Sequence, residues 1–390
     1  MMMKSVVFFL ALMLVVPVFG QLSIGNGDHN LEFSGMVSTY YNQRFLKSDN
    51  NNRNKDRFKL RDAQLQLEGR YKNLYEYELQ IDFVDLAAAT VGLVDPENPG
   101  LMDAYMVYKG LDWIDIKVGY SKLPYSKSSL TPFMFTAFWQ RAELVRGDVF
   151  SRRDVGLTLM KSMWNQRIQL QAGAYTGLGE LSLRGDNDAS GGLEYVGRVD
   201  FAYPSRFRMR DIDEKVSPIP LFNLGVNARY FNKTQPEGRT LPAFSQGEYG
   251  IKVIDGERLA YGFDLSMMYK GFSAQFEIHQ LRFTPNNGQG LQGLDPSISE
   301  GYFLAGGYFA QTNYFAKSWK SVFSARFEEL DLNDLVPGNS HRLSVAYAYQ
   351  LRGWNSMLKI QYFGILKEEL PIDPLRWTEQ VRLGWQYAFR

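Results

Sequence analysis

Apolar and polar residues alternate along most of this chain, and the final segment, residues 378–389, shows the pattern clearly. One set of alternate positions there is apolar or aromatic: Val381, Leu383, Trp385, Tyr387 and Phe389. The positions between them hold Gln380, Arg382, Gly384, Gln386 and Ala388. Because successive side chains of a strand point to opposite sides, the segment predicts a strand with one apolar face and one hydrated face.

The same alternation recurs along the chain and predicts about sixteen strands, an even number as single-chain bacterial barrels have. The predicted strands are 32–41, 62–71, 75–83, 103–109, 114–121, 155–159, 168–172, 199–201, 222–228, 263–269, 272–278, 302–308, 323–327, 343–349, 358–362 and 378–389. The predicted fold class is all-β, an antiparallel transmembrane β-barrel with lipid outside and water inside. A soluble β-sandwich also alternates, but its apolar face points inward and a chain of this length would tend to split into domains.

The connections between the predicted strands alternate between short and long. The short ones are 72–73, 110–112, 163–165, 270–271, 316–317 and 353–355. The long ones are 46–55, 86–100, 122–152, 176–192, 232–258 and 284–298, with shorter ones near Pro337 and Pro371. Short periplasmic turns and long external loops are typical of outer-membrane barrels. One connection departs from this rule, since Pro204 to Pro220 is long but falls on the predicted periplasmic side. A tethered hairpin or a protein contact would account for it.

The first residues have the features of a processing signal. Lys4 precedes an apolar run from Val6 to Val16, which ends in Pro17-Val18-Phe19-Gly20. This predicts a cleaved signal peptide over residues 1–20 and a barrel domain over residues 21–390. The run is shorter than a membrane-spanning helix requires. The expected location is the outer membrane of a Gram-negative bacterium.

Composition agrees with a barrel and excludes several other classes. Aromatic residues make up 15% of a chain whose mean hydropathy is only −0.29, as aromatic girdles at two membrane interfaces require. The formal charge is +1, so no basic excess points to nucleic acid. The chain contains no cysteine, which excludes disulfides and a lipid-modified N-terminus.

Several segments resemble one porin family. They include Phe58–Gly69, Asp103–Tyr105, Val118–Pro124 and Arg153–Gly156, followed by Tyr261–Leu265, Gly271–Ser273 with Glu277, and Ala325–Glu328. In their order and spacing they resemble the phosphate-selective porin O and P family, over nearly the whole mature chain. The resemblance implies a homotrimer of sixteen-stranded barrels, each narrowed by an inward-folded third loop, with basic side chains that draw small anions such as phosphate through by passive diffusion.

This chain departs from the family pattern at two places. Where the family carries consecutive basic residues in an early strand, Arg61 is followed by Asp62, which by parity faces the lumen. Other acidic residues share that inward parity: Glu68, Glu76, Glu78, Asp82, Asp103 and Asp115. At the terminus, Arg390 follows the aromatic Phe389. The expected solutes are therefore small anionic or polar molecules, with mild rather than strict anion preference.

The segment 122–152 is the expected constriction, because it is the longest external loop and follows the family-like stretch at 118–124. The predicted pore-lining and anion-binding residues are Arg61, Lys117, Lys122, Lys127, Arg141, Arg146, Arg152, Arg153 and Arg198. Rings of cations in a narrow bore attract anions, and weak binding at several sites still permits exit. The alternative is that these charges neutralise acidic neighbours or lie at the rim.

Other functions have less support from the residues. The chain has three histidines, His29, His279 and His341, and no pattern that positions a nucleophile beside one, so no catalytic residue is predicted. No cofactor or metal is expected, although the oxygen-rich runs 49–52 and 186–188 could hold calcium. A third hypothesis is a non-conducting barrel that anchors a surface or secretion complex, for which the charged connection 204–220 is the supporting feature.

Overall fold

The structure is a computed structural model. It describes residues 22–25, 27–46, 55–84, 100–146, 151–177, 179, 192–233, 256–285, 302–331, 334, 339–368 and 377–389. The predicted signal peptide at 1–20 and the candidate calcium loops at 49–52 and 186–188 lie outside the described residues. No helix of the described parts has the length and apolar character that crossing a lipid bilayer requires.

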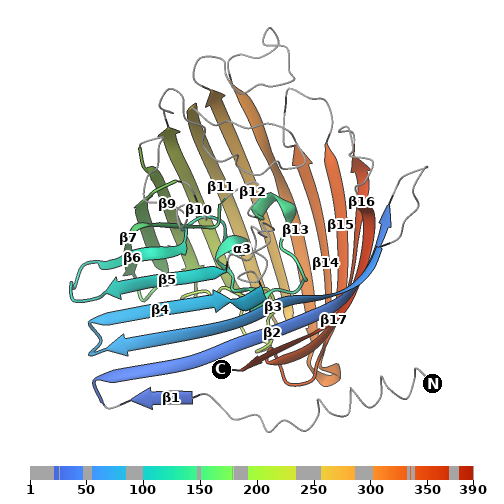
Figure 1. The fold of residues 1–390 in the computed structure, drawn as a ribbon, viewed down its shortest axis with the longest axis horizontal. Coiled ribbons are helices and arrows are strands. Elements are labelled where there is room, and N and C mark those ends of the chain that lie inside the picture. The colour runs from blue at the N-terminus through green and yellow to red at the C-terminus, as the bar shows by residue number, and fades with distance from the viewer. Residues whose placement is uncertain are drawn as a thin grey trace.

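Sixteen antiparallel strands of the described chain form one closed barrel (Figure 1). They are β2 (His29–Leu46), β3 (Lys55–Tyr71), β4 (Tyr75–Asp82), β5 (Leu101–Tyr108), β6 (Asp115–Lys122), β7 (Arg153–Met163), β8 (Ile168–Tyr175), β9 (Glu194–Tyr203), β10 (Leu221–Lys233), β11 (Gly256–Tyr269), β12 (Phe272–Pro285), β13 (Phe303–Ala316), β14 (Ser321–Asp331), β15 (Ser340–Gln350), β16 (Ser356–Glu368) and β17 (Trp377–Phe389). Each strand pairs with its neighbours in sequence, and β17 closes the barrel against β2. The predicted fold class is confirmed.

A short additional strand, β1 (Leu22–Gly25), was not predicted. It pairs with β2 from Leu22 opposite Phe33 to Gly25 opposite Asn30. The pairing of β17 with β2 ends at Phe389 opposite Gly35, so β1 continues along the same edge of β2 where β17 stops. The extra strand therefore extends this edge without adding a seventeenth member to the closed ring.

The predicted alternation determines which side of the barrel each residue faces. In β11, Leu265 is 42% exposed while its neighbours Asp264 and Ser266 are buried. A closed barrel has two surfaces, so the apolar exposed residues form the outer one and the buried polar residues line the inside. The register follows from this pattern, because a slip of one residue would move every apolar side chain to the wet side.

The short connections lie where the sequence predicted them, at the end of the barrel that also holds β1 and the end of β17 (Figure 1). We call this the turn end. Lys72 and Asn73 both have positive φ values, 49° and 56°, which is the conformation of a two-residue hairpin turn that matches strand twist. Lys270 and Gly271 repeat it at 49° and 86°.

Among the described residues, short helices occur mainly between β6 and β7. They are α3 (Lys127–Leu130), η2 (Phe133–Phe135) and η3 (Glu143–Val145), and a fourth, η6 (Lys317–Trp319), forms the turn between β13 and β14. Figure 1 draws α3 within the curve of the strands. The three helices between β6 and β7 thus belong to a segment that lies inside the barrel.

Candidate pore constriction

The segment between β6 and β7 packs against the inner wall of the barrel. We call residues 123–146 the constriction segment; most of it is buried and none of it is fully exposed. Its backbone N–H groups donate to inward side chains of three separate strands. Ser128 donates to Glu277 on β12 at 2.7 Å, Trp139 to Gln361 on β16 at 2.7 Å, and Glu143 to Glu328 on β14 at 2.6 Å.

The constriction segment has local features that stop it from continuing as strand. Ser126 has a φ of 59°, and its hydroxyl caps α3 by accepting from the N–H of Ser129 at 3.1 Å. Thr131 ends the helix and donates its hydroxyl to the carbonyl of Lys127 at 3.0 Å. Pro132 then begins the η2 turn. These short helical turns place polar backbone groups toward the wall.

Aromatic residues of the constriction segment fill the space between it and the barrel wall. Phe138 and Trp139 are almost completely buried. The ring of Trp139 lies 5.6 Å from that of Tyr40 on β2, between centroids. Their burial excludes water from this side of the lumen and holds the segment in place.

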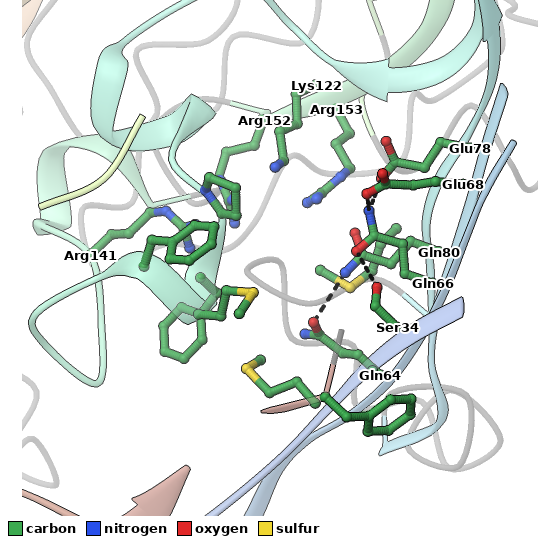
Figure 2. Close-up of a pocket in the computed structure, with 18 residues that line it drawn as sticks. Ser34, Gln64, Gln66, Glu68, Glu78, Gln80, Lys122, Arg141, Arg152 and Arg153 are labelled. Atoms are coloured by element: carbon green, nitrogen blue, oxygen red, sulfur yellow. Dashed lines mark hydrogen bonds between the residues drawn. The ribbon is translucent and has the colours of Figure 1, made fainter. Parts of the chain in front are cut away.

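A cavity of about 220 Å³ remains between the constriction segment and the wall formed by β2 to β5. Figure 2 shows basic side chains on one side of it and amide and carboxylate side chains on the other. The basic residues are Lys122, Arg141, Arg152 and Arg153. The opposite wall contributes Ser34, Gln64, Gln66, Glu68, Glu78 and Gln80. Four cations thus share the cavity with two carboxylates.

The four cations are held in different ways. Arg153 is paired with Asp103 at 2.9 Å, and Arg141 donates to the carbonyls of Ser128 and Thr131 at 3.0 and 2.6 Å. Arg152 donates to the carbonyl of Ser129 at 3.4 Å. These contacts fix the guanidinium groups at the cavity wall, so the field they create does not depend on mobile side chains.

Lys122 differs from the three arginines. It lies at the end of β6, is half-buried, and lines the cavity. Its amine makes no hydrogen bond or salt bridge with another residue in the described part of the chain. Among the four basic residues that line the cavity, it is therefore the one whose charged group is not held by another described residue.

The opposite wall is ordered by its amides. Gln66 donates to Glu68 at 2.7 Å and to Glu78 at 2.9 Å, and Gln80 donates to Gln64 at 3.1 Å. The alternation puts Gln64 and Gln66 on the polar face of their strand, but neither is among the predicted pore-lining residues. Only the folded barrel shows that this face meets the constriction segment across a cavity.

Arg61 contacts the cavity indirectly. Its guanidinium lies 3.4 Å from the centroid of the Phe133 ring, and Phe133 lines the cavity. It is also paired with Asp62 at 2.9 Å. The cation and the acidic residue that follows it in the sequence therefore form a buried ion pair.

Three further predicted cations lie away from the cavity lining. Lys117, on β6, has its amine 5.3 Å from the ring centroid of Tyr105. Lys127, on α3, donates to Gln275 at 3.1 Å and to the carbonyl of Arg210 at 3.3 Å. Burial lowers the pKa of the Lys127 amine from its ordinary value, and nearby carboxylates oppose that shift. Arg146 is bonded to Glu143 of its own segment at 3.0 Å.

Arg198 also lies away from the cavity lining, between two carboxylates. It faces inward from β9, as parity predicted, and is paired with Asp200 and Asp264 at 2.6 Å each. Other ion pairs occur further along this wall: Arg229 of β10 with Glu194 of β9 at 2.8 Å, and Arg326 with Glu328 on β14 at 2.8 Å. On this side of the lumen the charges neutralise one another, so the cations that line the cavity are those opposite β2 to β5.

A model of the phosphate-selective porin O and P family matches residues 35–206. Over these residues the predicted resemblance to this porin family is confirmed; the family-like segments after residue 206 lie outside the match. The match covers β3 to β9, the constriction segment and all four basic residues that line the cavity. No curated protein sequence matches the chain significantly.

Solved structures of outer-membrane channels share the fold. An anion-selective porin from Comamonas acidovorans has a TM-score of 0.57 at 12% identity, over 93% of this chain and 100% of that one. A trimer form of OmpT from Vibrio cholerae gives 0.55 at 10%, over 93% and 100%. The outer membrane channel DcaP of Acinetobacter baumannii gives 0.52 at 11%, over 96% and 100%. At such low identities the likeness concerns the fold alone.

Proposed function

We propose that this chain is an outer-membrane porin that lets small hydrophilic solutes, anions in preference, diffuse passively across the membrane. The observation that carries the proposal is the cavity between the constriction segment and β2 to β5, where four cations face two carboxylates. Fixed cations in a narrow, partly dehydrated bore attract anions and repel cations. The two carboxylates and the amides make the preference mild, since they also stabilise cations and neutral polar solutes.

The comparisons support the same reading. The matching family is described as phosphate-selective, and one similar structure is described as anion-selective. A similar structure is a trimer, and we propose that this chain is also a homotrimer in the outer membrane, reached through the predicted signal peptide. Porins have an apolar outer surface, and the exposed leucines, valines and aromatic residues of the strands supply one.

Enzymatic function has little support from the described residues. His279 is buried, with one ring nitrogen 3.1 Å from the hydroxyl of Tyr125 and the other 2.9 Å from Glu277. Both nitrogens are therefore occupied, one by Tyr125 of the constriction segment and the other by a contact within β12. No group of three or more metal-ligating side chains occurs among the described residues.

Planar-bilayer recording tests the proposal. The purified protein should insert as open channels, with conductance steps in groups of three for a trimer. A potassium chloride gradient should give a reversal potential of anion-selective sign, and phosphate should compete with chloride. A clear cation preference would contradict the selectivity, and barrels that insert without conducting would contradict the porin.

A further inference from the structure

The connection between β9 and β10, residues 204–220, is much longer than the other connections described at the turn end, and it folds into the barrel. Its residues Phe207, Ile212 and Asp213 are 5%, 1% and 2% exposed. The sequence left open a tethered hairpin or a protein contact. The structure shows a partly buried segment, in which Phe207 and residues 211–213 lie inside while Arg206 and Arg208 are exposed.

Asp211 joins this connection to the constriction segment. Its carboxylate accepts from the N–H of Ala137 at 3.0 Å, and its own N–H donates to the carbonyl of Phe135 at 3.1 Å. Beside it, the guanidinium of Arg210 lies 5.4 Å from the Phe135 ring centroid, and Ile212 packs in one buried cluster with Ala137. Segments that enter from opposite ends of the barrel therefore meet in its interior.

Asp211 also fixes the connection to the wall. The same carboxylate accepts from Gln311 on β13 at 3.1 Å. The backbone carbonyl of Asp211 accepts from the hydroxyl of Ser273 on β12 at 2.6 Å and from the amide of Asn313 on β13 at 3.0 Å. One residue thus ties together the connection, the constriction segment and two strands, through charge-assisted and neutral hydrogen bonds that are sheltered from water.

We infer that residues 204–217 form a second internal barrier, which closes the β10–β15 side of the lumen from the turn end and holds the constriction segment against it. Asp211 is its positioning residue. Solutes can then pass only through the cavity along β2 to β5. The connection therefore determines both where the permeation path runs and how wide it is. The inference rests on the proposed porin function and assigns that function a second structural element.

Two variants test the inference. In one, residues 204–221 are replaced by Asn-Gly, which forms a two-residue turn between Tyr203 and Phe222, a pair already opposed in the sheet. In the other, Asp211→Ala removes only the carboxylate. Asp112→Ala is the matched control, because Asp112 is an exposed acid in the turn between β5 and β6 at the same end.

The shortened variant should conduct about two-fold more than wild type or better, and Asp211→Ala should show a smaller increase, since a wider path passes more ions. Both should admit larger sugars in liposome swelling, while heat-modified migration on gels shows that the barrel is intact. Asp112→Ala should match wild type. Unchanged conductance and size limit in both folded variants would overturn the inference.

Hydrogen exchange supplies a readout that does not need an open channel. The Ala137 N–H should exchange about tenfold faster or more in Asp211→Ala, because a buried hydrogen bond to a charged group contributes about 1.5 to 3 kcal/mol. Unchanged exchange would count against Asp211 as a positioning residue. If wild type itself failed to conduct, the porin proposal would fall, and exchange would still decide the role of Asp211.

Discussion

Arg61 and Asp62 are consecutive residues of β3, yet both side chains point into the barrel, 4% and 0% exposed. The cause lies in the pairing of β3 with β2. Asp62 is opposite Ser38 and Leu60 is opposite Thr39, so Arg61 is the extra residue of a β-bulge. The bulge turns the guanidinium inward, where it bonds to Asp62 and lies over Phe133.

Asp62→Asn should make the channel more anion-selective. The carboxylate neutralises Arg61 beside the cavity, and the amide keeps the shape and part of the hydrogen bonding while it removes the charge. We expect the chloride-to-potassium permeability ratio from reversal potentials to rise about two-fold. Asp56→Asn, the same change at an exposed position of the same strand, should alter it little. A ratio equal to wild type would mean that Arg61 does not act on permeating ions.

Lys122→Glu should have the opposite effect. The substitution replaces the one cavity cation whose amine makes no hydrogen bond or salt bridge in the described residues, and it adds a third carboxylate beside Glu68 and Glu78. The reversal potential in a salt gradient should move toward cation preference, and phosphate should compete less with chloride. Lys72→Glu, at an exposed turn, is the control for net charge. If both variants shifted selectivity equally, the cavity would not be the selective region.

Arg198→Ala should affect stability more than selectivity. Without the guanidinium, the buried carboxylates of Asp200 and Asp264 lose their shared partner. Removing one member of a buried ion pair lowers the free energy of unfolding by about 3 to 5 kcal/mol. Water in the lumen would hydrate the two carboxylates and make the loss smaller. Urea unfolding in detergent should detect the loss, whereas Arg206→Ala, at an exposed site, should stay within about 0.5 kcal/mol of wild type. A large selectivity change at unchanged stability would restore Arg198 as an anion-binding residue.

The parts of the fold that the sequence predicted are those set by local chemistry. Alternation with a period of two fixes which side each residue faces, so strands such as 263–269 and 378–389 were found without tertiary information. Turns at Lys72-Asn73 and Lys270-Gly271 were found because the residues there suit tight hairpins. The family-like residues led to the prediction of a constriction between residues 122 and 152, the part of the chain in which the segment between β6 and β7 packs against the wall.

The parts that the sequence did not predict depend on contacts between distant segments. The bulge at Arg61 reverses local parity and follows from register against β2. Arg153 meets Asp103 fifty positions away, and Asp211 meets Ala137 at a separation of 74. Such pairs exist only after the barrel closes, and no local pattern marks them. For the same reason, Arg198 and Arg153 looked alike in sequence although one lies between two acids and the other lines the cavity.

The constriction segment should loosen when its anchor on β12 is removed. Glu277 accepts from the hydroxyl of Ser126 at 2.6 Å and from the N–H of Ser128 at 2.7 Å, so Glu277→Ala loses two buried, charge-assisted hydrogen bonds. Their combined loss, about 3 kcal/mol, corresponds to roughly 100-fold faster exchange of the Ser128 N–H if the segment opens locally. Exchange of peptides spanning 123–131 measures this, with Glu329→Ala, at a partly exposed carboxylate on β14, as the control. Equal exchange in the two variants would mean that the neighbouring anchors at Trp139 and Glu143 hold the segment without Glu277, because each donates its own N–H to a different strand.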